Sequence, residues 1–338
     1  MDSHVLVTGG AGYIGSHVVR QLHECGRRTV ALDTLETGFR DAVLHGELAV
    51  GDIADRDFVR DLLRRFGVKS VIHLAAHTSV AESVADPLRY YRNNTGASRA
   101  LIESCVAEGV ERFIFSSSAA VYGAPDVDRV TERTPADPVN PYGASKSMTE
   151  RMLRDVSAAT GMRHTILRYF NVAGADPRGR IGQSTKNATL LVKVACETAL
   201  GRRGHMPIHG TDYPTADGTC VRDYIHVEDL ADAHILALRS LEEGADSDTF
   251  NCGYGRGYSV REVIAAVERA AGVPIDAREA PRRAGDPPRL VADASRIREA
   301  LGWTPRFDDL DKIARTSLAW EQVLLGPPEK AGHNRANE

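Results

Sequence analysis

Several features that mark common protein classes are absent from this sequence of 338 residues. Its five cysteines are scattered and are never spaced as CxxC, so neither a disulfide framework nor a zinc site is indicated. No apolar run approaches the roughly 18 residues of a membrane-spanning helix. The net charge of −4 leaves no basic excess for nucleic acid or an anionic membrane. We therefore expect neither nucleic acid nor a membrane as a partner.

The sequence also gives no sign of a metal site or a signal peptide. His73 and His77 are four residues apart, but His73 falls in a predicted strand, so we expect it to be packed or hydrogen-bonded. The first residues, MDSH, lack the basic segment and long apolar run of a signal peptide. With cysteines that suit a reducing compartment, these features predict a cytoplasmic protein without a metal.

What is present in the first half is an alternation of short β-rich runs with longer helical patterns. Strands are predicted at 4–8, 29–33, 70–75, 112–117 and 164–168. Helices, with apolar residues three and four apart, are predicted at 13–25, 55–66, 85–108 and 143–160. This alternation implies right-handed crossovers and an α/β fold, a doubly wound parallel sheet of the Rossmann type.

The pattern changes after residue 170, where glycine and proline become frequent. Residues 173–189 and 201–222 are predicted as loops around one helix near 190–200, and further helices at 227–242, 259–272, 295–301 and 309–324. We expect a dinucleotide-binding domain over 1–170. A smaller C-terminal substrate-binding lobe is expected over 171–325, with segments that return to the first domain, and a disordered tail over 326–338.

A glycine-rich turn follows the first predicted strand. Gly9, Gly12 and Gly15 stand between that strand and a helical pattern, which is the context that a dinucleotide-binding motif requires. The first glycine permits the tight turn, the second lets the backbone approach a pyrophosphate, and the third lets the helix pack on the strand. The alternative is a glycine turn without a ligand. The motif together with its context favours a nicotinamide dinucleotide.

The second predicted strand ends at an acidic residue, Asp33, 18 residues after Gly15. A carboxylate there accepts hydrogen bonds from the adenosine ribose and repels a 2′-phosphate. NAD is therefore favoured over NADP as the cofactor.

A phenol and an ammonium stand four residues apart in YGASK, as Tyr142 and Lys146, and share a face if the segment is helical. A nearby Lys⁺ and a positive nicotinamide ring both favour phenolate, so Tyr142 is expected to have a lowered pKa and to act as a base. Ser118 stands at the end of a predicted buried strand. There it could hydrogen-bond the same substrate hydroxyl from which Tyr142 would take the proton. The alternatives are a solvated helix face and a serine-rich turn.

Five segments, TGGAGYIG, SSSAAVYG, YGASK, LRYFNVAGA and DGTCVRDYIHVEDLADAH, together resemble the extended short-chain dehydrogenase/reductases. They are most similar to the UDP-galactose 4-epimerase family, in the same order and over about residues 4 to 324. The resemblance implies an isomerase with tightly bound NAD and a UDP-hexose substrate. Tyr142 takes the proton of the hydroxyl on sugar carbon 4 while hydride passes to the nicotinamide. The 4-keto sugar turns over in the pocket, and hydride returns to its other face.

The resemblance also assigns further positions. It gives Ser118 the orientation of the sugar hydroxyl and Lys146 the nicotinamide ribose. The cofactor site is implied to comprise Gly9, Gly12, Tyr13, Ile14, Gly15, Asp33, Asp52, Ile53, Leu74, Ala75, Ala76, Asn93, Ser116, Tyr142, Lys146 and Tyr169. The UDP-sugar site is implied to comprise Ser118, Tyr142, Asn171, Leu191, Arg222, Arg283, Asp286 and Leu290. Relatives are commonly homodimers, and helices 85–108 and 143–160 are expected to form the interface.

This chain departs from family patterns at several positions. Thr78 replaces a lysine found in many relatives, and Leu190 replaces an asparagine or histidine found in some. Related dehydratases carry an Asp–Glu pair where this chain has Ala119 and Ala120, so elimination is disfavoured. At the Leu290 position, tyrosine is associated with glucose and galactose only, and smaller residues with 2-acetamido sugars as well.

Three functions remain open from the sequence. The first is interconversion of UDP-glucose and UDP-galactose. The second is 4-epimerisation of chiefly another UDP-sugar, an N-acetylhexosamine or a pentose. The third is a catalytically silent NAD-binding protein, against which the intact Tyr142, Lys146 and Ser118 speak.

Overall fold

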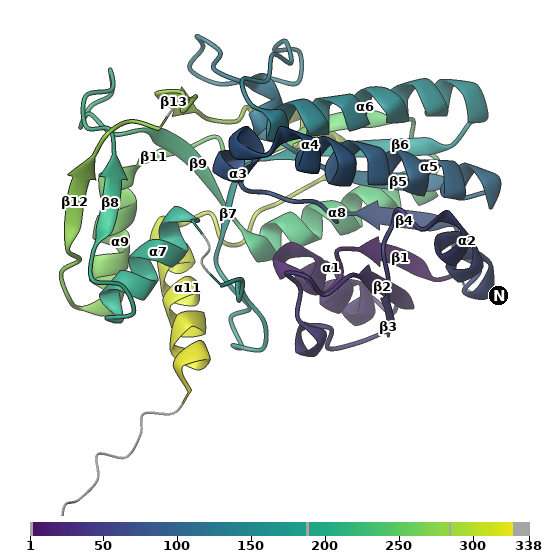
Figure 1. The fold of residues 1–338 in the computed structure, drawn as a ribbon, viewed down its shortest axis with the longest axis horizontal. Helices are drawn as coiled ribbons and strands as arrows, with labels where there is room; N and C mark the ends of the chain where they lie inside the picture. Colours follow the sequence, from purple (N-terminus) through teal and green to yellow (C-terminus); the bar gives the residue numbers. More distant parts are fainter. Residues whose placement is uncertain (1–2, 187–188, 284, 327–338) are drawn as a thin grey trace, which may run out of the picture.

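The computed structural model describes residues 3–186, 189–283 and 285–326. These residues form a larger and a smaller lobe (Figure 1). The larger lobe is built on a seven-stranded sheet in which all neighbouring strands are parallel. Its order is β10 (Asp248–Cys252), β6 (Arg163–Tyr169), β5 (Arg112–Ser118), β4 (Ser70–His73), β1 (Val5–Thr8), β2 (Thr29–Asp33) and β3 (Glu47–Val50). The predicted doubly wound α/β fold is confirmed.

Helices cover both faces of this sheet, because side chains that alternate along each strand point to opposite faces. Leu6 belongs to an apolar core with Leu101 and Leu153, whereas Val7 belongs to a second core with Leu230. The helices of the first core are α2 (Arg56–Arg65), α5 (Ala97–Ala107) and α6 (Pro141–Thr160); those of the second are α1 (Tyr13–Glu24) and α8 (Val227–Glu242).

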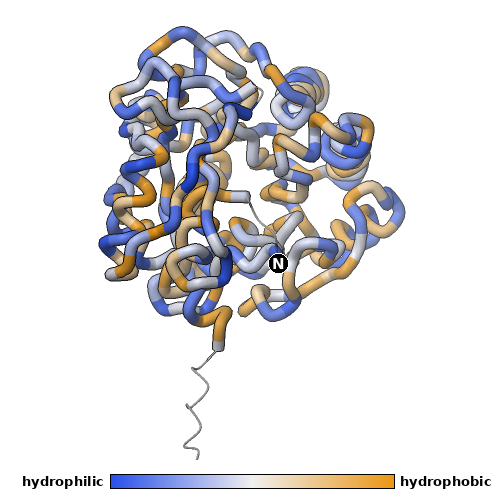
Figure 2. Tube along the Cα trace, turned by 60° about the vertical axis from the view of Figure 1, so that its left-hand side comes forward, coloured by the Kyte–Doolittle hydropathy of each residue, from blue (hydrophilic) through white to orange (hydrophobic). Residues whose placement is uncertain are grey.

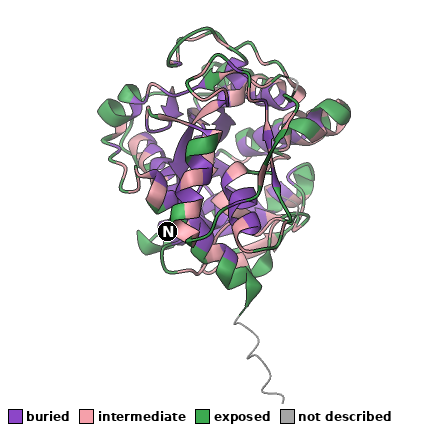
Figure 3. Cartoon of the chain, turned by 90° about the vertical axis from the view of Figure 1, so that its left-hand side faces the viewer, coloured by how far each residue is buried: buried purple, intermediate pink, exposed green. Residues whose placement is uncertain are grey.

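The smaller lobe continues the second core without a break. A mixed sheet holds β11 (Gly257–Ser259), β9 (Val221–His226), β13 (Arg289–Leu290) and β7 (Asn171–Ala173), and β8 (Met206–His209) pairs with β12 (Ala277–Ala280). Around them lie α7 (Leu191–Ala199), α9 (Val260–Ala271), α10 (Ser295–Leu301) and α11 (Leu310–Leu325). Apolar and polar residues alternate along the trace (Figure 2), and the exposed residues lie mainly on the outer faces of the helices (Figure 3).

Short helical pieces complete the larger lobe. They are η1 (Arg40–Ala42), α3 (Val80–Ala85), α4 (Pro87–Tyr90), the π-helical η2 (Tyr91–Gly96) and η3 (Ala119–Tyr122). The helix predicted over 85–108 is thus α4, η2 and α5 in succession. A π-helical turn widens the helix and re-aims the side chains that follow it, and such turns are frequent at functional sites.

Two parts of the loop prediction are wrong. β8 and the start of β9 lie within 201–222, and β3 was not predicted at all. α8 and β10 belong to the layers of the first sheet, although their residues follow 171. The domain boundary at 171 stays a prediction, and of the tail over 326–338 only Gly326 lies within the described residues. No helix of the described ranges is both long and apolar enough to cross a membrane.

Candidate active site

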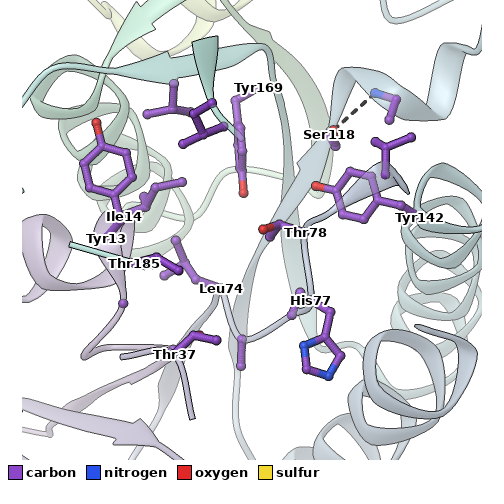
Figure 4. Close-up of a pocket in the computed structure, with 18 of the residues that line it drawn as sticks. Tyr13, Ile14, Thr37, Leu74, His77, Thr78, Ser118, Tyr142, Tyr169 and Thr185 are labelled. Atoms are coloured by element: carbon purple, nitrogen blue, oxygen red, sulfur yellow. Dashed lines mark hydrogen bonds between the residues drawn. The ribbon is translucent and has the colours of Figure 1, made fainter. Parts of the chain in front are cut away.

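A cavity of about 470 Å³ lies between the carboxyl ends of the central strands and the smaller lobe (Figure 4). This is the place where open parallel sheets bind ligands. Of the predicted site residues, it is lined by Gly9, Gly12, Tyr13, Ile14, Gly15, Asp33, Asp52, Ile53, Leu74, Ala75, Ala76, Asn93, Ser118, Tyr142, Tyr169, Asn171, Arg222, Asp286 and Leu290.

The glycine turn is closed so tightly that side chains would not fit. A Cβ on Gly9 would lie 2.8 Å from the Ala75 nitrogen, and one on Gly15 would lie 2.0 Å from the Gly9 oxygen. Gly9 also has a φ of 68°, which favours glycine. Gly12 caps α1 without a side chain, so the first N–H groups of that helix face the cavity edge. The turn therefore fits a dinucleotide pyrophosphate.

Asp33 is fixed at the end of β2 by two main-chain donors. The Ala11 N–H donates to Oδ2 at 3.0 Å, and the Leu35 N–H donates to Oδ1 at 2.8 Å. Each carboxylate oxygen keeps a further acceptor position, so a ribose hydroxyl can still bind. The acidic Glu36 also lines this end of the cavity, a residue that the sequence reasoning missed.

Tyr142 stands in the first turn of α6, where Asn140 caps the helix by accepting from the Gly143 N–H at 2.9 Å. Its side chain is buried, and its hydroxyl points toward Ser118 and Thr78 (Figure 4). Lys146, one turn further, is also buried, and its Nζ donates to the Ser116 carbonyl at 2.9 Å. A solvated helix face is thereby excluded. Within the described chain, neither Lys146 nor Ser116 lines the cavity directly.

The pKa directions at this pair differ in part from expectation. Burial raises the pKa of Tyr142, and the hydrogen bond with Ser118 opposes that rise. Burial lowers the pKa of Lys146 to about 7, against the charge of Glu150. In the polypeptide alone, burial therefore opposes the expected lowering of the Tyr142 pKa, because it desolvates the phenolate. The lowering by a bound nicotinamide ring stays a prediction.

Asn94, in the π-helical turn, is a supporting residue that the sequence reasoning missed. Its Oδ1 accepts from the His77 N–H at 2.9 Å, and its Nδ2 donates to the His77 carbonyl at 3.0 Å and to the Ser145 Oγ at 3.1 Å. It thus joins the segment after β4, which lines the cavity, to α6. The feature of the sequence that could have indicated this role is the pair of consecutive asparagines, Asn93 and Asn94. His73, as predicted, is hydrogen-bonded, to Thr8 at 2.7 Å and Ser98 at 2.8 Å.

The smaller lobe supplies the far side of the cavity. Arg222 on β9 has Nη2 3.6 Å from the Asp286 Oδ1, and it lies beside Leu290 in the strand register. Leu290 is 9% exposed, lines the cavity and also belongs to a small apolar cluster with Tyr122 and Phe170.

Two predicted substrate residues are placed differently. Leu191 begins α7 and packs on the second apolar core, so its neighbour Leu190 lines the cavity instead. Arg283 is exposed and, among the described residues, is not part of the lining. Their roles in substrate binding stay predictions.

Comparison with known proteins places this arrangement in a family. The model of the NAD dependent epimerase/dehydratase family matches residues 5–253. A UDP-glucose 4-epimerase of Azospirillum brasilense is 54% identical over 97% of this chain and 94% of its own length. The structure of UDP-glucose 4-epimerase from Brucella ovis in complex with NAD matches with a TM-score of 0.91 and 43% identity, over 94% of this chain and 97% of that one. That of the UDP-Glc/GlcNAc 4-epimerase from Campylobacter jejuni matches with a TM-score of 0.83 and 46% identity, over 95% and 99%. The chain belongs to the NAD-dependent epimerase/dehydratase family.

Proposed function

We propose that this protein interconverts UDP-glucose and UDP-galactose by transient oxidation at sugar carbon 4, with tightly bound NAD as cofactor. The observation that carries the proposal is one cavity that joins the glycine turn, the Tyr142 and Ser118 hydroxyls, and Arg222 of the smaller lobe. Relatives named UDP-glucose 4-epimerase, and the NAD in the Brucella ovis structure, support it.

In this proposal bound NAD would supply the acceptor and donor of the carbon-4 hydride. Ser118 orients the sugar hydroxyl, and Tyr142 takes its proton and later returns it. Lys146, held by the Ser116 carbonyl, supplies the nearby positive charge and a donor for the nicotinamide ribose. Ala119 and Ala120 line the cavity beside Ser118 and have no acid or base with which to eliminate water, which favours epimerisation.

The cofactor and the UDP-sugar divide the cavity between them. The glycine turn, Asp33 and the cofactor-set residues that directly follow β3 and β4 would hold NAD. Arg222 would bind the diphosphate, because a guanidinium matches paired phosphate oxygens. Asp286 would accept from the uridine ribose, and Asn171 and Leu290 would contact the sugar.

The deciding experiment incubates the purified protein with a panel of UDP-sugars and analyses the products for the carbon-4 epimer. We expect UDP-galactose to yield UDP-glucose, and absorbance or fluorescence to report bound NAD(H). Bound NAD without conversion of any UDP-sugar would instead favour a catalytically silent protein. Conversion of a UDP-pentose far above both hexoses would assign the second function.

A broader substrate range is favoured by one observation, the leucine at 290. Leucine is shorter than tyrosine, so the wall is recessed and apolar and can pack against an acetyl methyl. We propose that UDP-N-acetylglucosamine and UDP-N-acetylgalactosamine are also interconverted, more slowly. The Campylobacter jejuni relative, a UDP-Glc/GlcNAc 4-epimerase, supports this range.

We also propose a cytoplasmic homodimer. Large apolar side chains are exposed on the two helical regions expected at the interface: Leu88 at 71%, Met148 at 46% and Val106 at 37%. Such residues on adjacent helices suit an isologous four-helix contact. All five cysteines are free thiols, which suits a reducing compartment. Light scattering of the purified protein would give twice the chain mass.

A further inference from the structure

Part of the wall of the cavity is formed by a segment without secondary structure. Residues 174–186 form neither helix nor strand, yet Gln183 and Thr185 line the cavity together with Leu190. Figure 4 shows Thr185 near Ile14 and Leu74. A ligand wall requires a fixed main chain. Since no strand ladder holds segment 181–186, its position must come from contacts with neighbouring elements.

The first such contact is with α11. A Cβ on Gly182 would lie 2.4 Å from the Trp320 Cγ, so the main chain of the segment packs flat against the indole. A void of about 20 Å³ lies beside this contact, and Gln183, Lys193, Trp320 and Glu321 are among the residues that line it. Packing therefore does not hold the segment continuously, and polar contacts gain importance.

The second contact is a hydrogen bond from a buried lysine. The Lys193 Nζ donates to the Gln183 carbonyl at 3.0 Å, and the same nitrogen forms an ion pair with Glu321. Lys193 is 6% exposed and Glu321 2%. Glu321 also pairs with Arg202 at 2.7 Å.

Such a pair is costly to bury and is weak support for stability, because apolar residues of similar size often serve as well. What an apolar residue cannot do is donate to the Gln183 carbonyl. The burial of Lys193 is therefore best explained by its hydrogen bond to the main chain at Gln183. The burial of Glu321 is best explained by its neutralisation of the lysine charge.

Further contacts extend the same face of α11 to the start of the segment. The Gly174 N–H donates to the Ser317 Oγ at 2.9 Å, and the Ala175 N–H donates to the Thr316 Oγ1 at 3.4 Å. One face of this helix, remote from every motif of the sequence, thus contacts residues 174–175 as well as residues 182–183.

We propose that Lys193, held by Glu321, and Trp320 are positioning residues that set the shape of the cavity wall through segment 181–186. Among the described residues, none of the three lines the large cavity, so they act through Gln183 and Thr185 rather than by touching substrate. This inference rests on the proposed function only in taking a UDP-sugar as the ligand of the cavity.

The test compares three variants of the full chain with wild type. Lys193→Met removes the donor and leaves two buried carboxylates that pair with it, Glu321 and Glu197, with less compensation. Lys193→Met/Glu321→Leu removes the donor and the more deeply buried carboxylate, while Glu197 keeps its ion pair with Arg203, so thermal stability should recover in part. Arg202→Met removes the other partner of Glu321 and leaves the bond to Gln183 in place, which makes it the matched control.

We expect both Lys193 variants to raise KM for UDP-galactose roughly 3- to 10-fold, the effect of one lost hydrogen bond, with kcat changed less than KM. The double variant should keep the raised KM although its melting temperature returns toward wild type. Arg202→Met should lower the melting temperature and leave KM unchanged. A double variant with wild-type KM would overturn the inference.

A second readout needs no substrate. Amide hydrogen exchange in residues 181–186 should become faster in both Lys193 variants and stay unchanged in Arg202→Met. Unchanged exchange in the Lys193 variants would overturn the positioning role. If wild type converts no UDP-sugar, the proposed function fails, and the exchange experiment still decides whether Lys193 holds the segment.

Discussion

The two sides of the cavity are built in different ways. Most of the cofactor side is formed by short stretches at the ends of β1, β2, β3 and β4, each next to the strand that positions it. The sugar side gathers single residues from far-apart segments, among them Asn171, Arg222 and Leu290. A local motif suffices for the first side, whereas the second exists only when the smaller lobe is folded. The two sides should therefore respond separately to substitution.

The largest effect is expected where the two sides meet, at Tyr142. Tyr142→Phe keeps the ring shape and removes the proton-transferring hydroxyl, so turnover of UDP-galactose should fall about 10²- to 10⁴-fold. Bound NAD, measured by absorbance after denaturation, should be unchanged. Turnover near the wild-type rate would show that Tyr142 does not transfer the proton. Loss of bound NAD would show that the hydroxyl of Tyr142 is also needed on the cofactor side.

The next-largest effect is expected at Lys146, which we assign to the cofactor side. It is measured in the pH dependence of turnover. Lys146→Ala removes a cation, which disfavours the Tyr142 phenolate, so the rising acidic limb of the pH–rate profile should move to higher pH. The pKa of Lys146 itself is lowered to about 7 by burial, so in wild type this cation is present below about pH 7 and is lost above it. Bound NAD should also fall, through the lost contact to the nicotinamide ribose. A limb that does not move would contradict the electrostatic role.

On the sugar side, Leu290→Tyr should narrow the substrate range. The added ring fills the recess, so turnover of UDP-N-acetylglucosamine should fall roughly 10- to 100-fold, the usual cost of overpacking. UDP-galactose turnover and bound NAD should change little, and Leu290→Met serves as the volume-matched control. If the wild-type protein turns over UDP-galactose well and does not convert UDP-N-acetylglucosamine, Leu290 does not control the size of the sugar in this chain.

The smallest effect is expected at Asp33, and it should touch the cofactor alone. Asp33→Ala removes the repulsion of a 2′-phosphate, about 1 kcal/mol for charges near 4 Å in water, so the preference for NAD over NADP should fall roughly 5-fold. Asp33→Asn is the matched variant, because it keeps an acceptor for the Ala11 or Leu35 N–H. If both variants exclude NADP as wild type does, Glu36 is the next residue to replace.

The same contrast explains how far the sequence predicts the molecule. The central strands and their helices follow from periodicity, and the glycine turn and Asp33 from spacing, because these signals are local. β3 was missed because it is an edge strand whose end residues, Glu47 and Val50, are exposed, so no buried apolar run marks it. β8 was missed because a four-residue strand among glycines and prolines leaves little pattern.

On the sugar side, single-residue shifts decide the outcome. Leu190 faces the cavity and Leu191 the core, a difference set by the residue at which α7 begins. Asn94 and Lys193 read as polar positions on helix surfaces, and only the tertiary structure shows that they are buried. The rise that burial causes in the pKa of Tyr142 likewise cannot be predicted from the sequence, since the tertiary structure sets the degree of burial.

The return of β10 to the first sheet has a consequence for dissecting the protein. β10 pairs with β6 through residues 248–252, so a truncated chain that ends at 170 would lack this strand. It would also lack α8, which contacts β5, β6 and α1, so the apolar core on that face of the sheet would lose one of its two helices. Such a fragment would present β6 as a bare edge with unpaired N–H and C=O groups, a template for edge-to-edge aggregation. The dinucleotide half is therefore not an autonomous unit for expression, and a shortened version would need 227–252 grafted back to stay dispersed.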